Sequence, residues 1–249
     1  VFYKGNATKC GQWNFDENGE IIHGASEHNY VDGICSNCGK YSEEKTQGVA
    51  YGYDATENNG NGAYYVDLNT TLNLSVVEIL GKYNDGIHGE LPVTYVRNRA
   101  FDGNTNITRV ILPESVTQLD GAAFANCSNL EFISMTGIVN MRFVGGLKRS
   151  YIEGTYDTTN NFLFCAKLKY VIVNKDFNLY YDTPEARQFY GSSAGEANVY
   201  VMGSEDDSTV KCGTAGNNNL LSGKVYYYSE TQKAGCWHYD DNGNAELWA

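Results

Sequence analysis

Four side chains near the start of the chain have the types and spacing of a metal site. Cys35 and Cys38 form a Cys-x-x-Cys pair within HNYVDGICSNCG, His28 precedes Cys35 by seven residues, and Cys10 supplies a third thiol. Zinc prefers four tetrahedral nitrogen and sulfur ligands, and a Cys-x-x-Cys turn presents two thiolates to one ion. These four residues are therefore the candidate ligands of a structural zinc ion, with His23 as a competing ligand.

Three states of these thiols stay open from the sequence alone. Besides metal binding, Cys35 could form a disulfide with Cys38, or Cys10 with either of them, in an oxidising compartment. The third state is free thiols. A redox role is disfavoured because the Cys-x-x-Cys lies in a Gly- and Asn-containing loop, not at a helix start after a strand. A metal here would stabilise a loop-rich module without implying catalysis.

The rest of the chain must position this Cys/His module. The clearest feature of that remaining part is a sequence repeat. Residues 91–113 align without a gap with residues 114–136. A period of 23 residues lies in the range of leucine-rich repeats, whose units bury their apolar side chains against the next unit. The matching pairs are Val93 and Val116, Val96 and Leu119, Ala100 and Ala123, Phe101 and Phe124, Ile107 and Leu130, Val110 and Ile133, and Leu112 and Met135.

Further copies of the repeat are less regular. A third copy starts at Phe162, 38 residues after Phe124, which places an insertion at about residues 145–159. A looser fourth copy starts at Phe189. Alternating apolar residues in the copies predict short strands with one face in the core. Further strands are predicted around Val77 and Ile79, Val199 and Val201, and Val225 and Tyr227.

Two Cys residues fall inside the repeat at matching positions. Cys127 and Cys165 follow the Phe of the second and third copies by the same spacing. Free Cys often behaves as a small buried hydrophobic residue. We therefore predict that these two thiols are core residues and have no part in the metal site.

The repeat resembles the BspA-like leucine-rich repeat of bacterial cell-surface proteins. The resemblance is carried by the pattern Ala-Phe-x-x-Cys-x-x-Leu-x-x-Ile-x-Met, read from Ala123 to Met135, and covers residues 77–201. The endings VYYYSE and CWHYDDNGNAELW are similar to segments that close such proteins. The resemblance implies a secreted or surface-attached α/β protein, a strand-rich horseshoe solenoid with little helix. It implies adhesion or host-molecule binding and no catalytic residues.

The repeat also divides the chain. Residues 1–45 form the Cys/His module, 46–76 a strand-rich N-terminal cap, 77–203 the leucine-rich repeats, and 204–249 the last strand and a C-terminal cap. Caps are expected because an open solenoid end exposes its core.

Residues between the inward-pointing ones predict an outer sheet face that is unusually apolar and aromatic. Such a face is typical of recognition surfaces. Phe132, Tyr170 and Tyr200 are the candidate anchors of a protein or glycan ligand. The alternative is that an insertion, a terminal segment or a second copy of the chain covers this face. The candidate ligand-binding residues are Arg109, Ile111, Phe132, Tyr170, Ile172, Tyr200 and Tyr226.

Composition and motifs argue against several classes of function. The net charge is −12, which argues against binding to nucleic acid or to anionic membrane surfaces. No run of 18 apolar residues is present, so no membrane-spanning segment is predicted. The chain has no phosphate-binding loop and no nucleophile motif. We therefore predict a non-enzymatic, extracellular or cell-surface recognition module for a host or neighbouring-cell protein or glycan. The alternatives are a structural spacer and an enzyme with an unrecognised site.

Overall fold

The chain is built from strands, as a computed structural model shows. The structure describes residues 3–4, 10, 12–24, 27–67, 74–141, 161–162, 164–179, 197–212 and 223–249. Within them, helix is confined to α1 (Glu43–Thr46) and the 3-10 turns η1 (Asn58–Gly60) and η3 (Glu205–Asp207). None of the described helices is long and apolar enough to cross a membrane. The predicted strand-rich solenoid with little helix is confirmed.

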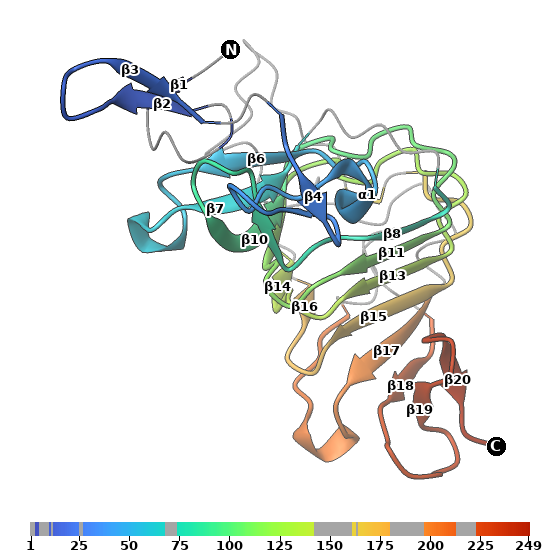
Figure 1. Cartoon of the computed structure of the whole chain (residues 1–249). Helices are drawn as coiled ribbons and strands as arrows, with labels where there is room; N and C mark the ends of the chain where they lie inside the picture. The colour runs from blue at the N-terminus through green and yellow to red at the C-terminus, as the bar shows by residue number, and fades with distance from the viewer. Residues whose placement is uncertain are drawn as a thin grey trace.

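The repeats supply one strand each to a parallel sheet that runs along one side of the molecule (Figure 1). Arg109 lies opposite Phe132, and Phe132 opposite Tyr170, so neighbouring strands are offset by one repeat. The 38-residue copy therefore keeps the register, because its extra residues lie outside the strands. In spatial order the strands are β18 (Val225–Tyr227), β17 (Asn198–Met202), β15 (Tyr170–Asn174), β13 (Phe132–Met135), β11 (Arg109–Leu112) and β8 (Val76–Glu78).

A second sheet closes the other side of the first repeats. Its β10 pairs in parallel with β7 and β12 and antiparallel with β9, and β6 flanks β7. A separate parallel pair, β14 with β16, continues along the same side further down the chain. The strands are β6 (Tyr51–Asp54), β7 (Ala63–Val66), β9 (Lys82–Asn84), β10 (Glu90–Val96), β12 (Gln118–Leu119), β14 (Asn140–Met141) and β16 (Asn178–Leu179).

The main core fills the space between the two sheets. The predicted inward residues Val110, Ile133, Val171 and Val199 are all fully buried. Three Phe rings, one per repeat, form a nearly parallel stack with centroids 5.0 Å and 5.7 Å apart. The stacked rings are Phe101, Phe124 and Phe162. Each unit thus buries its Phe against the unit before it, as a solenoid requires.

The repeat thiols belong to this core, as predicted. Cys127 and Cys165 are both fully buried. Each Sγ donates to the carbonyl of a Phe in the preceding repeat, Phe101 and Phe124 respectively, over 3.1 Å. Burial raises the pKa of Cys127 to about 12. These thiols therefore stay protonated and lie away from the N-terminal Cys/His residues.

Short strands form both ends of the chain (Figure 1). The N-terminal ones are β1 (Tyr3–Lys4), β2 (Gln12–Phe15), β3 (Ile21–His23), β4 (Tyr30–Val31) and β5 (Ile34–Cys35). At the C-terminus, β19 (Trp237–Tyr239) and β20 (Ala245–Leu247) form an antiparallel hairpin, called the C-terminal hairpin below. The predicted insertion at residues 145–159 and the fourth-copy Phe189 lie outside the described residues.

Candidate functional site

The structure brings the four predicted metal ligands together. One ligand atom from each of Cys10, His28, Cys35 and Cys38 lies within 4.8 Å of all the others. The Sγ atoms of Cys10 and Cys35 are 3.6 Å apart, and Cys38 Sγ is 3.4 Å from Nδ1 of His28. Bonds of about 2.3 Å to sulfur in a tetrahedron give edges of about 3.8 Å. This Cys/His cluster therefore has the size of a four-coordinate metal site.

Local backbone structure explains how the thiols converge. The β4–β5 hairpin carries Cys35 at its end, and the amide of Gly39 donates to the Cys35 carbonyl, closing the turn that holds Cys38. Burial alone would raise the pKa of Cys35. Hydrogen bonds from the backbone amides of Asn37 and Cys38, together with those to His28 and Cys10, outweigh burial and lower that pKa to about 6, whereas burial raises the pKa of the neighbouring Cys10 to about 11. Such amide bonds stabilise a thiolate, which is the form that binds metal.

The cluster rests against the second sheet of the solenoid. Gly86, in the turn between β9 and β10, has a φ of +83°, and a Cβ built there would lie 2.9 Å from Cys38 Sγ. A side chain at this position would strain the backbone and push against the thiol. Beside it, the Tyr41 amide donates to the Asn84 carbonyl over 3.0 Å. The Tyr41 hydroxyl donates to Oε2 of Glu90 over 2.7 Å.

The outer face of the parallel sheet is the second predicted site. Strand pairing places Arg109, Phe132 and Tyr170 in one row, as the sequence predicts. A second row runs through Ile111, Ser134, Ile172, Tyr200 and Tyr226. Seen from the sequence alone, both rows point to solvent.

The C-terminal hairpin covers part of this face. Trp237 is fully buried and packs edge-on against Tyr200, with ring centroids 5.6 Å apart. Its Nε1 donates to the Val201 carbonyl over 2.9 Å. Beneath the hairpin, Phe132, Ile172 and Tyr200 are only 6%, 0% and 3% exposed. The prediction that Phe132 and Tyr200 are open anchors is therefore corrected: together with Ile172 they form a second hydrophobic cluster, and the alternative of a covering terminal segment holds for them.

Arg109 holds the turn of this hairpin. Its guanidinium lies over the Phe132 ring, 3.5 Å from the centroid, and donates to the Gly243 carbonyl and to Oδ1 of Asn244. Asp240 prepares the turn, because its carboxylate accepts from the amides of Asn242 and Asn244. Burial lowers the pKa of Arg109.

Among the described residues, two hollows lie on the face, and the hairpin contributes to both. The smaller, of about 300 Å³, is lined by Arg109, Phe132 and Tyr170 together with Thr108, Glu131, Asn244 and Ala245. The larger, of about 640 Å³, lies at the other ends of the strands, where Ile111, Met202 and Tyr239 are among the residues that line it. Both volumes fall in the range of small-ligand sites. Tyr226 is half-buried at the margin of the second cluster.

Comparison with known families agrees with this architecture. A model described as the BspA type leucine rich repeat region matches residues 87–183 in six copies. This part of the chain is a BspA-type leucine-rich repeat region. Repeats of this type are typically protein-interaction modules without catalytic residues.

Three solved structures of bacterial leucine-rich repeat proteins are similar to this chain. A leucine-rich repeat protein from Bacteroides ovatus has 22% identity and a TM-score of 0.33; the match covers 63% of this chain but only 36% of that one. A leucine-rich repeat protein from T. pallidum has 15% identity and a TM-score of 0.30, with 72% and 83% covered. A leucine-rich cell surface protein from Faecalibacterium prausnitzii has 14% identity and a TM-score of 0.31, with 90% and 62% covered. A comparison with curated proteins found no match.

Several site residues of the BspA-type region and its hairpin were not predicted from the sequence. Trp237 and Tyr239 cover the sheet, and Thr108, Glu131 and Asn244 line the smaller hollow. One signal was available, because Asp-Asn-Gly between alternating apolar residues is typical of a β-hairpin. In a chain that ends in a hairpin, an apolar row on the outer face of the sheet predicts that the hairpin covers that row.

Proposed function

We propose that the chain is an extracellular or cell-surface recognition module that binds a protein or glycan at the outer face of its sheet. The observation that carries the proposal is the pair of hollows beside the C-terminal hairpin. Among the candidate ligand-binding residues, Arg109, Phe132, Tyr170 and Ile111 line these hollows, whereas Ile172 does not. The role is non-catalytic. The division of the chain at residues 45, 76 and 203 stays a prediction.

A printed array of extracellular-matrix proteins and glycans tests this proposal. We expect the full chain to bind a small subset of the array. The variant Tyr170→Ala in the smaller hollow, or Tyr239→Ala in the larger one, should weaken that binding at least tenfold. Ile22→Ala is the matched control, because Ile22 is an exposed apolar residue on β3, away from the sheet face. Binding that survives both hollow variants would overturn the site at the sheet face, and no binding at all would favour the spacer alternative.

We also propose that the Cys/His cluster binds one structural zinc ion through Cys10, His28, Cys35 and Cys38. The near-tetrahedral spacing of the ligand atoms supports this. Three thiols and one imidazole are a donor set that zinc favours. Because the four protein ligands complete the coordination sphere, no position is left for a substrate, and the ion would stabilise the fold. The side chain of the competing ligand His23 is not among those that the structure describes.

Metal analysis of the purified chain, combined with thiol counting, tests the zinc proposal. We expect about one zinc ion per chain, with loss of the ion in Cys35→Ser. Cys212→Ser is the matched control, since Cys212 packs against the main core and lies outside the cluster. A zinc-free chain with fewer than seven reactive thiols after denaturation would instead show a disulfide at the cluster.

A further inference from the structure

Arg109 is a half-buried cation on the outer face of the parallel sheet. Within the described part of the chain it makes no salt bridge, although the chain carries a net charge of −12. The charges of Asp240 and Glu78 favour the cation, but neither forms a salt bridge with it among the described residues. Glu131 pairs with Lys169 over 3.4 Å, and the Asp240 carboxylate accepts hydrogen bonds within its own turn. Desolvating a cation without a counter-charge is unfavourable, and an incoming anion would relieve that cost.

The guanidinium also has unused hydrogen-bonding capacity. It carries five N–H donors in a planar fork. Two hydrogen bonds, to Gly243 and Asn244, hold it against the Phe132 ring. The same side chain lines the 300 Å³ hollow. An Arg fixed in this way is suited to a carboxylate, because its remaining donors are already oriented.

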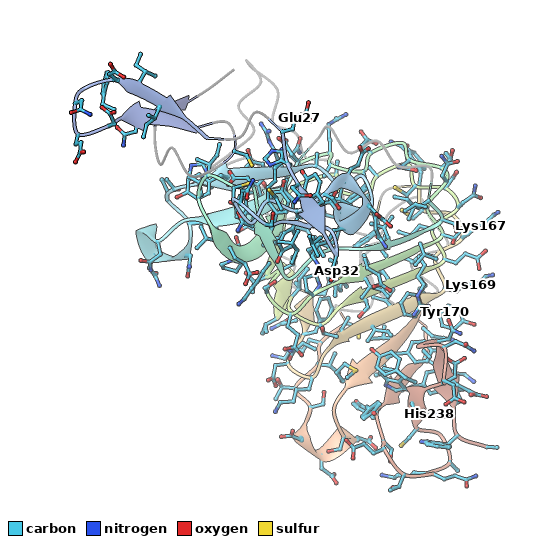
Figure 2. All side chains as sticks on the ribbon, viewed as in Figure 1. Glu27, Asp32, Lys167, Lys169, Tyr170 and His238 are labelled. Atoms are coloured by element: carbon cyan, nitrogen blue, oxygen red, sulfur yellow. The ribbon has the colours of Figure 1, made fainter. Side chains whose placement is uncertain are left out.

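The rest of the hollow combines one accessible aromatic ring with small hydrogen-bonding groups. Tyr170 is partly exposed on one side, and Thr108, Glu131 and Asn244 surround it with hydroxyl, carboxylate and amide groups. Figure 2 shows Lys167, Lys169 and Tyr170 together at the start of β15, with the hairpin that carries His238 below them. A sugar ring presents an apolar face to an aromatic ring and hydroxyls to polar neighbours. Lys169 offsets the charge of the Glu131 carboxylate, with which it pairs over 3.4 Å.

We propose that this hollow binds the carboxylate-bearing sugar unit of an acidic glycan. The carboxylate pairs with Arg109, the sugar ring lies on Tyr170, and the hydroxyls bond to Thr108 and Asn244. The inference rests on the proposed recognition function and names its ligand class. It goes beyond that function because nothing in the repeat pattern distinguishes an acidic glycan from a neutral one or from a protein.

Titration of the full chain with free sugars, followed by ligand-observed NMR, tests this inference. The acidic probes are N-acetylneuraminic acid and glucuronic acid, and the neutral probes are N-acetylglucosamine and glucose. N-acetylglutamate reports on a carboxylate without a sugar ring. We expect the acidic sugars to bind at least tenfold more tightly than the neutral sugars and than N-acetylglutamate. Their affinity should fall as salt is added, because surface charge interactions are screened.

Two variants locate the binding. Arg109→Gln and Tyr170→Ala should each weaken acidic-sugar binding at least tenfold. Because Arg109→Gln also removes the contacts to the hairpin turn, Tyr170→Ala, which leaves those contacts in place, is the deciding variant. Arg99→Gln is the matched control, since Arg99 is an exposed Arg paired with Asp102 in a repeat turn. It should leave the affinity unchanged.

The outcomes separate this inference from the recognition function. Equal binding of acidic and neutral sugars, equal binding of N-acetylglutamate, or no loss in Tyr170→Ala would each overturn the acidic-glycan inference. If no acidic sugar binds while an array ligand depends on Tyr239, the recognition function stands and this inference fails. If the acidic sugars bind as expected, both are supported.

Discussion

The Cys/His module at the N-terminus and the hairpin at the C-terminus are held by different physical means. At the C-terminal end, the hairpin buries Trp237 against Phe132, Ile172 and Tyr200, so apolar and aromatic area holds the cap. At the N-terminal end, the buried cluster consists of three thiols, and apolar residues of the same module such as Val31 and Ile34 are exposed. The C-terminal hairpin has an apolar core against the sheet, whereas the described part of the N-terminal module has the ligand atoms, a few hydrogen bonds and the contact of the Tyr41 ring with Tyr83.

This difference shows what a small module needs in order to fold. Segments that cannot bury enough apolar surface depend on metals or disulfides. Among the described residues, the N-terminal module contacts the solenoid mainly through Tyr41, which bonds to Glu90 and Asn84 and packs on Tyr83, and through Gly86 beneath Cys38. The C-terminal hairpin needs no such support. We therefore expect the two caps to respond in opposite ways to metal removal and to loss of an aromatic ring.

Metal removal should have the largest effect, and only at the N-terminal end. Apparent zinc-binding free energies in small zinc modules are about 10–16 kcal/mol, far more than the few polar contacts of this module can replace. Dialysis against a chelator should therefore abolish hydrogen-exchange protection in residues 27–41. Protection in β13, β15 and β17 should change little.

Two Cys variants serve as controls for the chelator experiment. Cys35→Ser should reproduce the chelator effect, and Cys212→Ser should not. If chelation left residues 27–41 protected, the module would have a source of stability other than metal. If it melted the central strands as well, the two ends would not be independent.

Loss of the buried ring should have the next largest effect, and only at the C-terminal end. Trp237→Ala removes a fully buried side chain and its hydrogen bond to Val201. Such substitutions cost about 3–5 kcal/mol. We expect hydrogen-exchange protection of β19 and β20 to be lost, with residues 27–41 unaffected.

The hairpin has a second Trp that serves as the matched control. Trp248 is only partly buried, stacks on His238 and donates to the Ser229 carbonyl over 3.0 Å. Trp248→Ala should therefore cost less than half as much as Trp237→Ala. Equal losses from the two variants would contradict the view that packing on the sheet, and not the hairpin itself, holds this cap.

The sequence predicts the repeated part of the fold well because each strand there is encoded by the same short pattern. The offset of 23 residues between Val110 and Ile133 becomes the register between β11 and β13. The burial of Cys127 and Cys165 follows from the same pattern. The choice of His28 and the three thiols as candidate ligands also follows from residue type, because few other Cys or His lie in that segment.

The repeat does not predict that the C-terminal hairpin covers the outer face of the sheet. Trp237 contacts Tyr200, which lies 37 residues earlier in the chain, and Arg109 contacts Gly243, which lies 134 residues later. Neither separation follows from the repeat. Periodicity assigns a side chain to a face but does not say whether a distant segment covers that face. The two hollows depend on that cover, so they too appear only in three dimensions.

The smallest expected effect concerns the contact between the N-terminal module and the solenoid. Tyr41→Phe removes the hydroxyl that donates to Glu90 and keeps the ring, whose edge meets Tyr83. Because the pair is only partly buried, we expect a loss of about 1 kcal/mol. Hydrogen exchange in residues 27–41 of the zinc-loaded chain measures this as a roughly fivefold faster opening, since 1.4 kcal/mol corresponds to about tenfold. Tyr226→Phe, in the distant parallel sheet, should leave these residues unchanged. No change in Tyr41→Phe would mean that the metal cluster alone holds the module, and that its docking on β10 adds nothing to its stability.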